Sequence, residues 1–290
     1  MRQVLLIPHI KVHNANAQSS PYTVGFPAMT AWLGAVHALQ RKLNQNGFDG
    51  VRFKGVGVFC HEIDFKGYKE ENFFYSIIGT RNPLKEDGTS PSFIEEARCQ
   101  LDVSLVIEFE GIKDDQEEMT KAIAQIKNEL LSKIKMASGD ILSFGNIEFI
   151  KIIEERDFKN LKRKIMPSYA IIERRSLMVQ AMQNGKDAIN ALLDHLKIMH
   201  RSQKDEDGKI TWTSKRKESG WIVPIATGFH GLTEIGKAGN QRDPDTPHRF
   251  AESVVTLGEF VMPYRLKSLD EMLWNYHVDL ENNLYLCQQN

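Results

Sequence analysis

The first half of the chain shows an ordered succession of apolar patterns, and this order restricts the fold more than any other feature. Residues 4–7 form a continuous apolar run, which predicts a strand buried on both faces. A helical period begins at Pro27, a residue that suits a first helical position, and continues to Leu43. Residues 51–59 and 103–109 alternate between the two faces, which predicts two further strands.

A second helix and a last strand complete this series. Apolar residues recur at helical spacing through residues 119–134, which predicts a helix that lies on a sheet and faces water. Residues 147–153 predict a strand, and residues 64–98 predict an elaborated hairpin connection because they are rich in glycine, proline and charge. The order strand, helix, strand, strand, helix, strand is that of ferredoxin-like and RNA-recognition folds. We therefore expect an α+β chain with a ferredoxin-like (βαββαβ) core in residues 1–156.

The segment after this core is expected to be an insertion. Residues 157–219 are rich in lysine and arginine and are predicted to be largely helical, with a helix over residues 177–199. Residues 202–209 predict an exposed turn. Such an insertion can serve as a thumb-like element.

The remaining residues, 220–290, are expected to pack on the core as a segment that carries a glycine-rich loop. Residues 220–229 predict a strand that is interrupted by Pro224. Residues 248–260 and 269–276 are each predicted to form a short helix.

The composition restricts the class of protein. A chain of 290 residues with 41% hydrophobic and 26% charged content is typical of a globular protein that buries a large core. A formal net charge of −1 argues against nonspecific coating of nucleic acid, which depends on many basic residues. The sequence has no run of eighteen apolar residues and no secretory signal, so we expect a cytoplasmic chain without a membrane partner. Three scattered cysteines, Cys60, Cys99 and Cys287, are expected to be buried small apolar groups.

The charged residues are unevenly distributed along the chain. Residues 158–175 contain six basic residues and one acid, whereas residues 108–118 contain six acids and one lysine. Opposed patches of this kind indicate an oriented interaction with an anionic partner. A solvated charged face is the alternative interpretation, and the sequence leaves both open.

The first predicted helix has two faces that can be buried. Trp32, Val36, Leu39 and Leu43 form one apolar stripe, and a row of alanines forms a second face of small side chains. One face would cover the sheet. The other would accept either the second half of this chain or a partner subunit.

Short polar side chains precede this helix, at residues 13–23. A polar loop at a helix N-terminus can hold a phosphate backbone or base edges. The alternative is a loop that satisfies its own backbone, because asparagine and serine are common turn residues. The first interpretation predicts that replacing Asn14 and Asn16 together with alanine leaves folding nearly intact and weakens nucleic-acid binding about tenfold.

Four stretches of the sequence resemble a known family. They are NANAQSSPYTVGFPAMTAWLGAVHAL, LLIPHIKVHN, GWIVPIATGF and RFAESVVTLGEF. These stretches are similar to the subunit of the Csy-type (type I-F) CRISPR surveillance complex that caps the 5′ end of the guide RNA, a Cas5-like member of the RAMP superfamily. The resemblance implies a non-catalytic subunit that binds the 5′ handle of the guide RNA (crRNA). It also implies that the subunit pairs with the large subunit, contacts the first backbone subunit and assists interference with target DNA.

The resemblance also implies which residues handle RNA. The polar segment before the first helix is expected to lie at the RNA surface, and the glycine-rich loop around residues 228–242 is expected to let the backbone approach RNA closely. Imidazole and guanidinium groups in or beside that loop can stack on bases or pair with phosphates. The predicted RNA-binding residues are His13, Asn14, Asn16, Ser19, Ser20, His230, Arg242 and Arg249.

The alternative function is an endoribonuclease of the same superfamily that processes repeat RNA. His13 is then the candidate general acid or base. The sequence shows no second titratable group paired with it, so we expect no catalytic residue. Asp243, Asp245 and His248 could ligate a metal, but acids separated by proline are typical of a turn. We expect neither a metal nor a cofactor.

Overall fold

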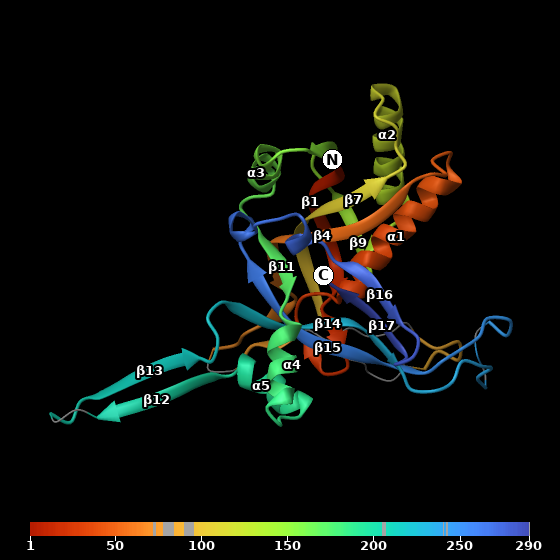
Figure 1. Ribbon diagram of the computed structural model, residues 1–290. Helices are drawn as coiled ribbons and strands as arrows, with labels where there is room; N and C mark the ends of the chain where they lie inside the picture. Colours follow the sequence, from red (N-terminus) through yellow and green to blue (C-terminus); the bar gives the residue numbers. More distant parts are fainter. Residues whose placement is uncertain are drawn as a thin grey trace.

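The structure is a computed structural model that describes residues 1–71, 74–77, 84–89, 96–204, 207–239, 241 and 243–289. Within this part of the chain, an eleven-stranded antiparallel sheet is combined with five α-helices (Figure 1). The fold is therefore a mixed α/β fold, as the apolar patterns predicted at the level of class.

The sheet strands occur along the chain as β1 (Arg2–Asn16), β4 (Arg52–Phe65), β7 (Arg98–Glu110), β8 (Lys135–Met136), β9 (Gly139–Ser143), β10 (Glu148–Ile152), β11 (Tyr169–Glu173), β14 (Trp221–Gly231), β15 (Ala251–Val261), β16 (Asn275–Asp279) and β17 (Leu284–Gln288). The helices are α1 (Met29–Gln45), α2 (Gln116–Ser132), α3 (Glu155–Lys164), α4 (Arg175–Gln183) and α5 (Ala188–Leu196). Short hairpins pair β2 (Gln18–Ser20) with β3 (Thr23–Val24) and β5 (Gly67–Tyr68) with β6 (Ser76–Ile77).

The strand order is β16-β17-β14-β15-β11-β4-β7-β1-β9-β8, and β10 also pairs with β1. The strands predicted at residues 4–7, 51–59, 103–109 and 147–153 are confirmed as parts of β1, β4, β7 and β10. Strands β1, β4 and β7 are longer than the predicted runs, and β10 is one residue shorter at each end. The order β4-β7-β1-β10, in which every neighbour is antiparallel, forms one half of the sheet.

Helices α1 and α2 cover one face of the sheet. Trp32, Val36, Leu39 and Leu43 are buried in the main core, as the stripe predicted. Helix α1 also packs against β14 and β17, near the end of the chain (Figure 1). The second half of this chain therefore covers α1, which favours the intrachain explanation of its small-residue face.

A second core lies on the opposite face. Val106 of β7 packs there with Phe158 and Leu161 of α3 and with Leu266 and Leu269, which flank two 3₁₀ turns, η1 (Pro263–Arg265) and η2 (Asp270–Met272). Alternate residues of β7 face the two cores because successive side chains on a strand point to opposite faces. This explains why β7 is buried along most of its length.

Two helix predictions for the C-terminal region are wrong. Residues 248–260 were expected to form a helix, but they hold strand β15, which is paired on both sides by β14 and β11. A central strand is buried on both faces and lacks the alternation that identifies a strand. Residues 269–276 form only the short turn η2 before β16 begins.

The helix predicted over residues 177–199 is also only partly correct. Two helices, α4 and α5, occupy this stretch, and Gly185 adopts a left-handed φ of 85° between them. Strand β12 (Ile198–Lys204) begins directly afterwards and pairs with β13 (Ile210–Arg216). The predicted exposed turn therefore begins later than Ser202, at the tip of a β-hairpin.

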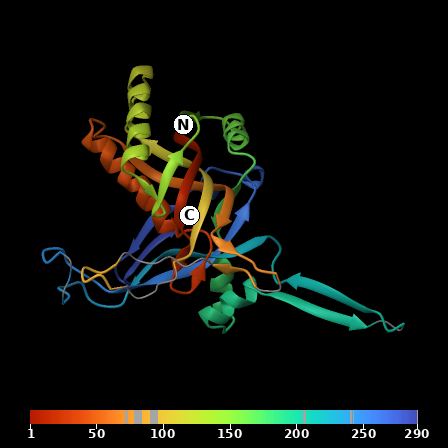
Figure 2. The same cartoon turned by 180° about the vertical axis from the view of Figure 1, so that it is seen from behind.

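The hairpin β12–β13, here called the arm, projects away from the rest of the molecule in both views (Figures 1 and 2). Strand β11 precedes the arm and joins the main sheet between β15 and β4. Segment 157–219 thus contributes a sheet strand as well as helices.

None of the helices that the structure describes is long and apolar enough to span a lipid bilayer.

Candidate functional site

The polar segment before α1 was expected to be a loop, but it continues strand β1 as far as Asn16. Asn14 lies at a register shift between β1 and β7 and has a left-handed φ of 61°. Its N–H donates to Oε1 of Gln100 over 3.0 Å, and its Oδ1 accepts a hydrogen bond from Nζ of Lys66 over 2.6 Å. The side chain of Asn14 therefore already stabilises the junction of β1, β4 and β7.

The next polar side chains also bond locally. Asn16 Oδ1 accepts from the N–H of Gln18, and Asn16 Nδ2 donates to the carbonyl of Gln18. Ser20 is 5% exposed, and its hydroxyl lies 2.6 Å from Oγ1 of Thr23, which also contacts Ser19. These contacts favour the interpretation in which the segment satisfies its own backbone. They lead us to expect that replacing both asparagines lowers the stability of the fold, in place of the nearly intact folding expected from the sequence.

We expect Asn14→Ala to lower the free energy of unfolding by about 1 to 3 kcal/mol, because an alanine in the left-handed region costs about 1 to 2 kcal/mol and the bond from Lys66 is lost. Asn14→Gly is the matched control, since glycine tolerates this backbone conformation and loses only the bond. Urea denaturation of the two variants measures the difference. A loss of stability as large in Asn14→Gly as in Asn14→Ala would contradict the role of the backbone.

His13 differs from its neighbours because its side chain is exposed. It lies beside a pocket of about 350 Å³ that Lys11, Glu62 and Gln100 also line. The residue opposite His13 in the β1–β9 register is Asp140, whose carboxylate is 2.6 Å from Nζ of Lys135. This hydrogen bond, with a smaller contribution from His13, lowers the pKa of Asp140.

The two predicted residues of the glycine-rich segment that the structure describes are His230, on β14, and Arg249, in the connection from β14 to β15. His230 is half-exposed, and its Nδ1 is 3.2 Å from Glu252 of the paired strand. Arg249 donates to Oδ1 of Asn283 over 2.9 Å. Arg242 lies outside the described residues. Gly228 belongs to β14 itself, where an added Cβ would lie 2.1 Å from a carbonyl of β17.

The possible metal ligands of this segment form a turn instead. Asp243 Oδ1 accepts from the N–H of Asp245, and Asp243 Oδ2 accepts from the hydroxyl of Thr246. These hydrogen bonds lower the pKa of the Asp243 carboxyl, the contact with Thr246 contributing most. Asp243 therefore closes a turn, as the alternative interpretation of the sequence stated.

The basic stretch at residues 158–175 was one candidate surface for an anionic partner. In the structure, five of its six basic side chains contact acids or a carbonyl of this chain: Lys159 pairs with Glu155, Lys162 donates to the carbonyl of Leu266, Lys164 pairs with Glu148, Arg174 with Glu259 and Arg175 with Glu173. These pairs neutralise most of the local charge. The stretch is better explained as part of the internal packing than as an anion-binding surface.

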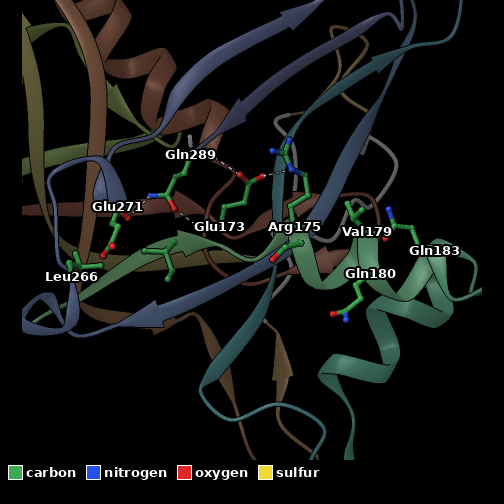
Figure 3. Close-up of a pocket in the computed structure, with 10 residues that line it drawn as sticks. Glu173, Arg175, Val179, Gln180, Gln183, Leu266, Glu271 and Gln289 are labelled. Atoms are coloured by element: carbon green, nitrogen blue, oxygen red, sulfur yellow. Dashed lines mark hydrogen bonds and ion pairs between the residues drawn. The ribbon is translucent and has the colours of Figure 1, made fainter.

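One of these pairs borders a pocket of about 600 Å³ (Figure 3). Burial raises the pKa of Glu173. Figure 3 shows its carboxylate between Gln289 and Arg175. Gln289 donates its N–H to Glu173 Oε2 over 3.1 Å and accepts the N–H of Glu173 over 2.7 Å. Glu173 thus joins the end of the chain to β11, which is a structural role.

The arm carries the exposed basic and aromatic groups that the sequence analysis did not assign. All fourteen residues of β12 and β13 are exposed, and Trp212 has an exposed fraction of 67%. An isolated two-stranded hairpin is at best marginally stable in water. An Asp-Gly pair at residues 207–208 between alternating strands is a hairpin signal that could have predicted the arm.

Four basic residues extend from the strands of the arm, which contain no acid: Arg201, Lys204, Lys215 and Arg216. Within the described part of the chain, no salt bridge neutralises any of them. This distinguishes the arm from the paired bases of residues 158–175. The strands of the arm therefore offer a basic surface that suits an anionic partner better than residues 158–175 do.

Comparisons with known proteins support the resemblance at the level of a type I-F Csy subunit. The model of the family described as CRISPR-associated protein (Cas_Csy2) matches residues 5–287. A protein of Pseudomonas aeruginosa (strain UCBPP-PA14), described as CRISPR-associated protein Csy2, is 31% identical over 309 aligned positions, which cover 97% of this chain and 94% of the relative. Both matches extend over the core, the arm and the C-terminal strands. The chain therefore belongs to the Cas_Csy2 family of CRISPR-associated proteins.

Proposed function

We propose that this chain is a non-catalytic, RNA-binding subunit of a type I-F CRISPR surveillance complex. In this role it binds the 5′ handle of the guide RNA, pairs with the large subunit, contacts the first backbone subunit and assists recognition of target DNA in the cytoplasm. The observation that carries the proposal is the family match over residues 5–287, because it includes nearly the whole chain.

The arm supports the RNA-binding part of the proposal. Four basic side chains that form no salt bridge with any described residue offer contacts to phosphates, and the exposed ring of Trp212 offers a face for a base. His13 and His230 retain exposed imidazoles and remain proposed RNA ligands. We assign a structural role to Asn14, Asn16 and Ser20, because their side chains form hydrogen bonds within the chain.

The strand pairings support a ferredoxin-like core of the RAMP type. In that fold the first strand lies between the third and fourth, and all neighbours are antiparallel. The order β4-β7-β1-β10, with α1 after β1 and α2 after β7, has this arrangement. The strands β11, β14, β15, β16 and β17 would then extend the core on its β4 side.

The surroundings of His13 support a non-catalytic role. General acid–base cleavage of RNA needs a second positioned group. The acid opposite His13, Asp140, is occupied by Lys135. Asp140 is therefore not free to serve as the second group that an RNA-processing endonuclease would need at this histidine.

The test is to purify the tagged chain from a host that carries the complete CRISPR system, and to identify the bound RNA and proteins. We expect guide RNA with an intact 5′ handle together with the large subunit, and we expect no cleavage of repeat RNA by the chain alone. A preparation without guide RNA would contradict the proposal. Cleavage that His13→Ala abolishes would establish the endonuclease instead.

A further inference from the structure

Two β-bulges face the same part of the central strand β7. The pairing of β1 with β7 shifts register between Ile7 and Ile10, and the pairing of β4 with β7 shifts between Cys60 and Glu62. His9 lies in the first bulge with a left-handed φ of 50°, and His61 lies in the second. Bulges change the direction of a side chain relative to the ladder. Here they bring two histidines from different strands together.

The two histidines meet beside a carboxylate. Their rings are stacked, with centroids 4.1 Å apart. His9 Nδ1 is 3.2 Å from each oxygen of Asp102, whose side chain is only 10% exposed. One ligand atom from each of His9, His61 and Asp102 lies within 4.8 Å of the other two. Three strands thus contribute three metal-binding groups to one point.

The hydrogen bonds of His61 define which of its nitrogens is free to bind. Its Nδ1 is 2.7 Å from the carbonyl of Pro167, which can only accept, so Nδ1 carries the proton. In the neutral ring, Nε2 then presents a lone pair, and it receives the hydroxyl of Ser104 over 2.7 Å. A histidine that binds a metal commonly donates its other N–H to a backbone carbonyl in this way.

We propose that His9, His61 and Asp102 form a binding site for a divalent transition metal of the zinc class. Nδ1 of His9, Nε2 of His61 and one oxygen of Asp102 would be its ligands, with a fourth position open to water or a further ligand. Nδ1 of His9 now donates its hydrogen to the Asp102 carboxylate, so metal binding requires that this proton be released to solvent or that the ring change to the tautomer protonated on Nε2. Ligands about 2.1 Å from a tetrahedral ion lie about 3.4 Å apart, close to the spacing of His9 and Asp102. This site does not depend on the proposed RNA-binding function.

Lys11 is the competitor for this site. Its Nζ lies 2.7 Å from Oδ2 of Asp102, so the ammonium group occupies one carboxylate oxygen. The Lys11 side chain is 48% exposed and can turn into water when a metal takes its place. The Ser104 hydroxyl must likewise release His61 and keep only the N–H of His9, which it accepts over 3.0 Å.

The test is a titration of the chelator-treated full chain with Co²⁺, followed by visible absorption and by displacement with Zn²⁺. We expect one saturable equivalent in the natural chain. His9→Ala and His61→Ala are expected to weaken binding at least about tenfold, whereas the exposed His277→Ala serves as the matched control and should bind normally. Thermal melts report whether each variant is folded.

Lys11→Met keeps the proposal testable if a histidine variant fails to fold. Removal of the competing cation from Asp102 is expected to raise the affinity for Co²⁺ at least about threefold. The absence of saturable Co²⁺ absorption in both the natural chain and Lys11→Met would overturn the proposal. An unchanged affinity for Co²⁺ in the folded variants His9→Ala and His61→Ala would also overturn the proposal.

Discussion

Replacement of Trp32 by alanine is expected to lower the free energy of unfolding by about 3 to 5 kcal/mol. The side chain is completely buried in the main core, and its Nε1 donates to the carbonyl of Pro27 over 3.3 Å. Its ring also stacks on Phe26, with centroids 5.4 Å apart. The variant loses this burial and leaves a cavity beneath α1. Urea denaturation followed by circular dichroism measures the loss.

The matched control is Trp212→Ala, which removes the same side chain from the arm. Trp212 is 67% exposed, so its removal is expected to change the free energy of unfolding by at most about 0.5 kcal/mol. A loss below about 1 kcal/mol in Trp32→Ala, or an equal loss in both variants, would contradict the burial of α1 described here.

Replacing the four basic residues of the arm with alanine is expected to weaken binding of guide RNA about a hundredfold at low salt and to leave stability nearly unchanged. All four residues lie on fully exposed strands. Each lost contact to a phosphate of single-stranded RNA should also reduce the slope of log K against log salt by about 0.7, so the slope should fall by about 3 in total. Filter binding or fluorescence anisotropy over a salt series measures both quantities.

A control with the same change of charge distinguishes the arm from the charge of the whole chain. It replaces four exposed basic residues outside the arm with alanine: Arg41, Lys113, Lys121 and Lys267. We expect this variant to retain most of its affinity and its salt dependence. Equal losses in the two variants would show that the arm is not the RNA surface.

The sequence predicted an element most reliably where the spacing of its own apolar residues matches the period of a helix or a strand. The stripe from Trp32 to Leu43 follows directly from one buried face on a helix, and the helix was predicted correctly. The alternation in residues 103–109 also predicted its strand correctly, although β7 is buried on both faces. Strand β15 was mistaken for a helix because burial on both faces removes that alternation. Its identity depends on β14 and β11, which are distant in the sequence or separated from it by a long connection.

The candidate site residues also include cases that the sequence left open and that only the structural contacts distinguish. The composition around Asn14 was compatible with an RNA-binding loop and with an internal turn, and only the contacts to Gln100 and Lys66 favour the second. Arg174 looks like a free charge in the sequence, but its acid, Glu259, lies on β15. Net charge over a stretch of chain cannot show whether distant acids neutralise it.

The sequence by itself determined the family, the mixed α/β class and the longer strands and helices of the first half, because extended similarity and periodicity are properties of the residues in order. Only the tertiary structure decided which basic groups stay unpaired and which side chains meet. His9, His61 and Asp102 are far apart in the chain and carry no common spacing. They come together because two bulges in separate strands open toward the same residues of β7, and strand register is set by the packing of the whole sheet.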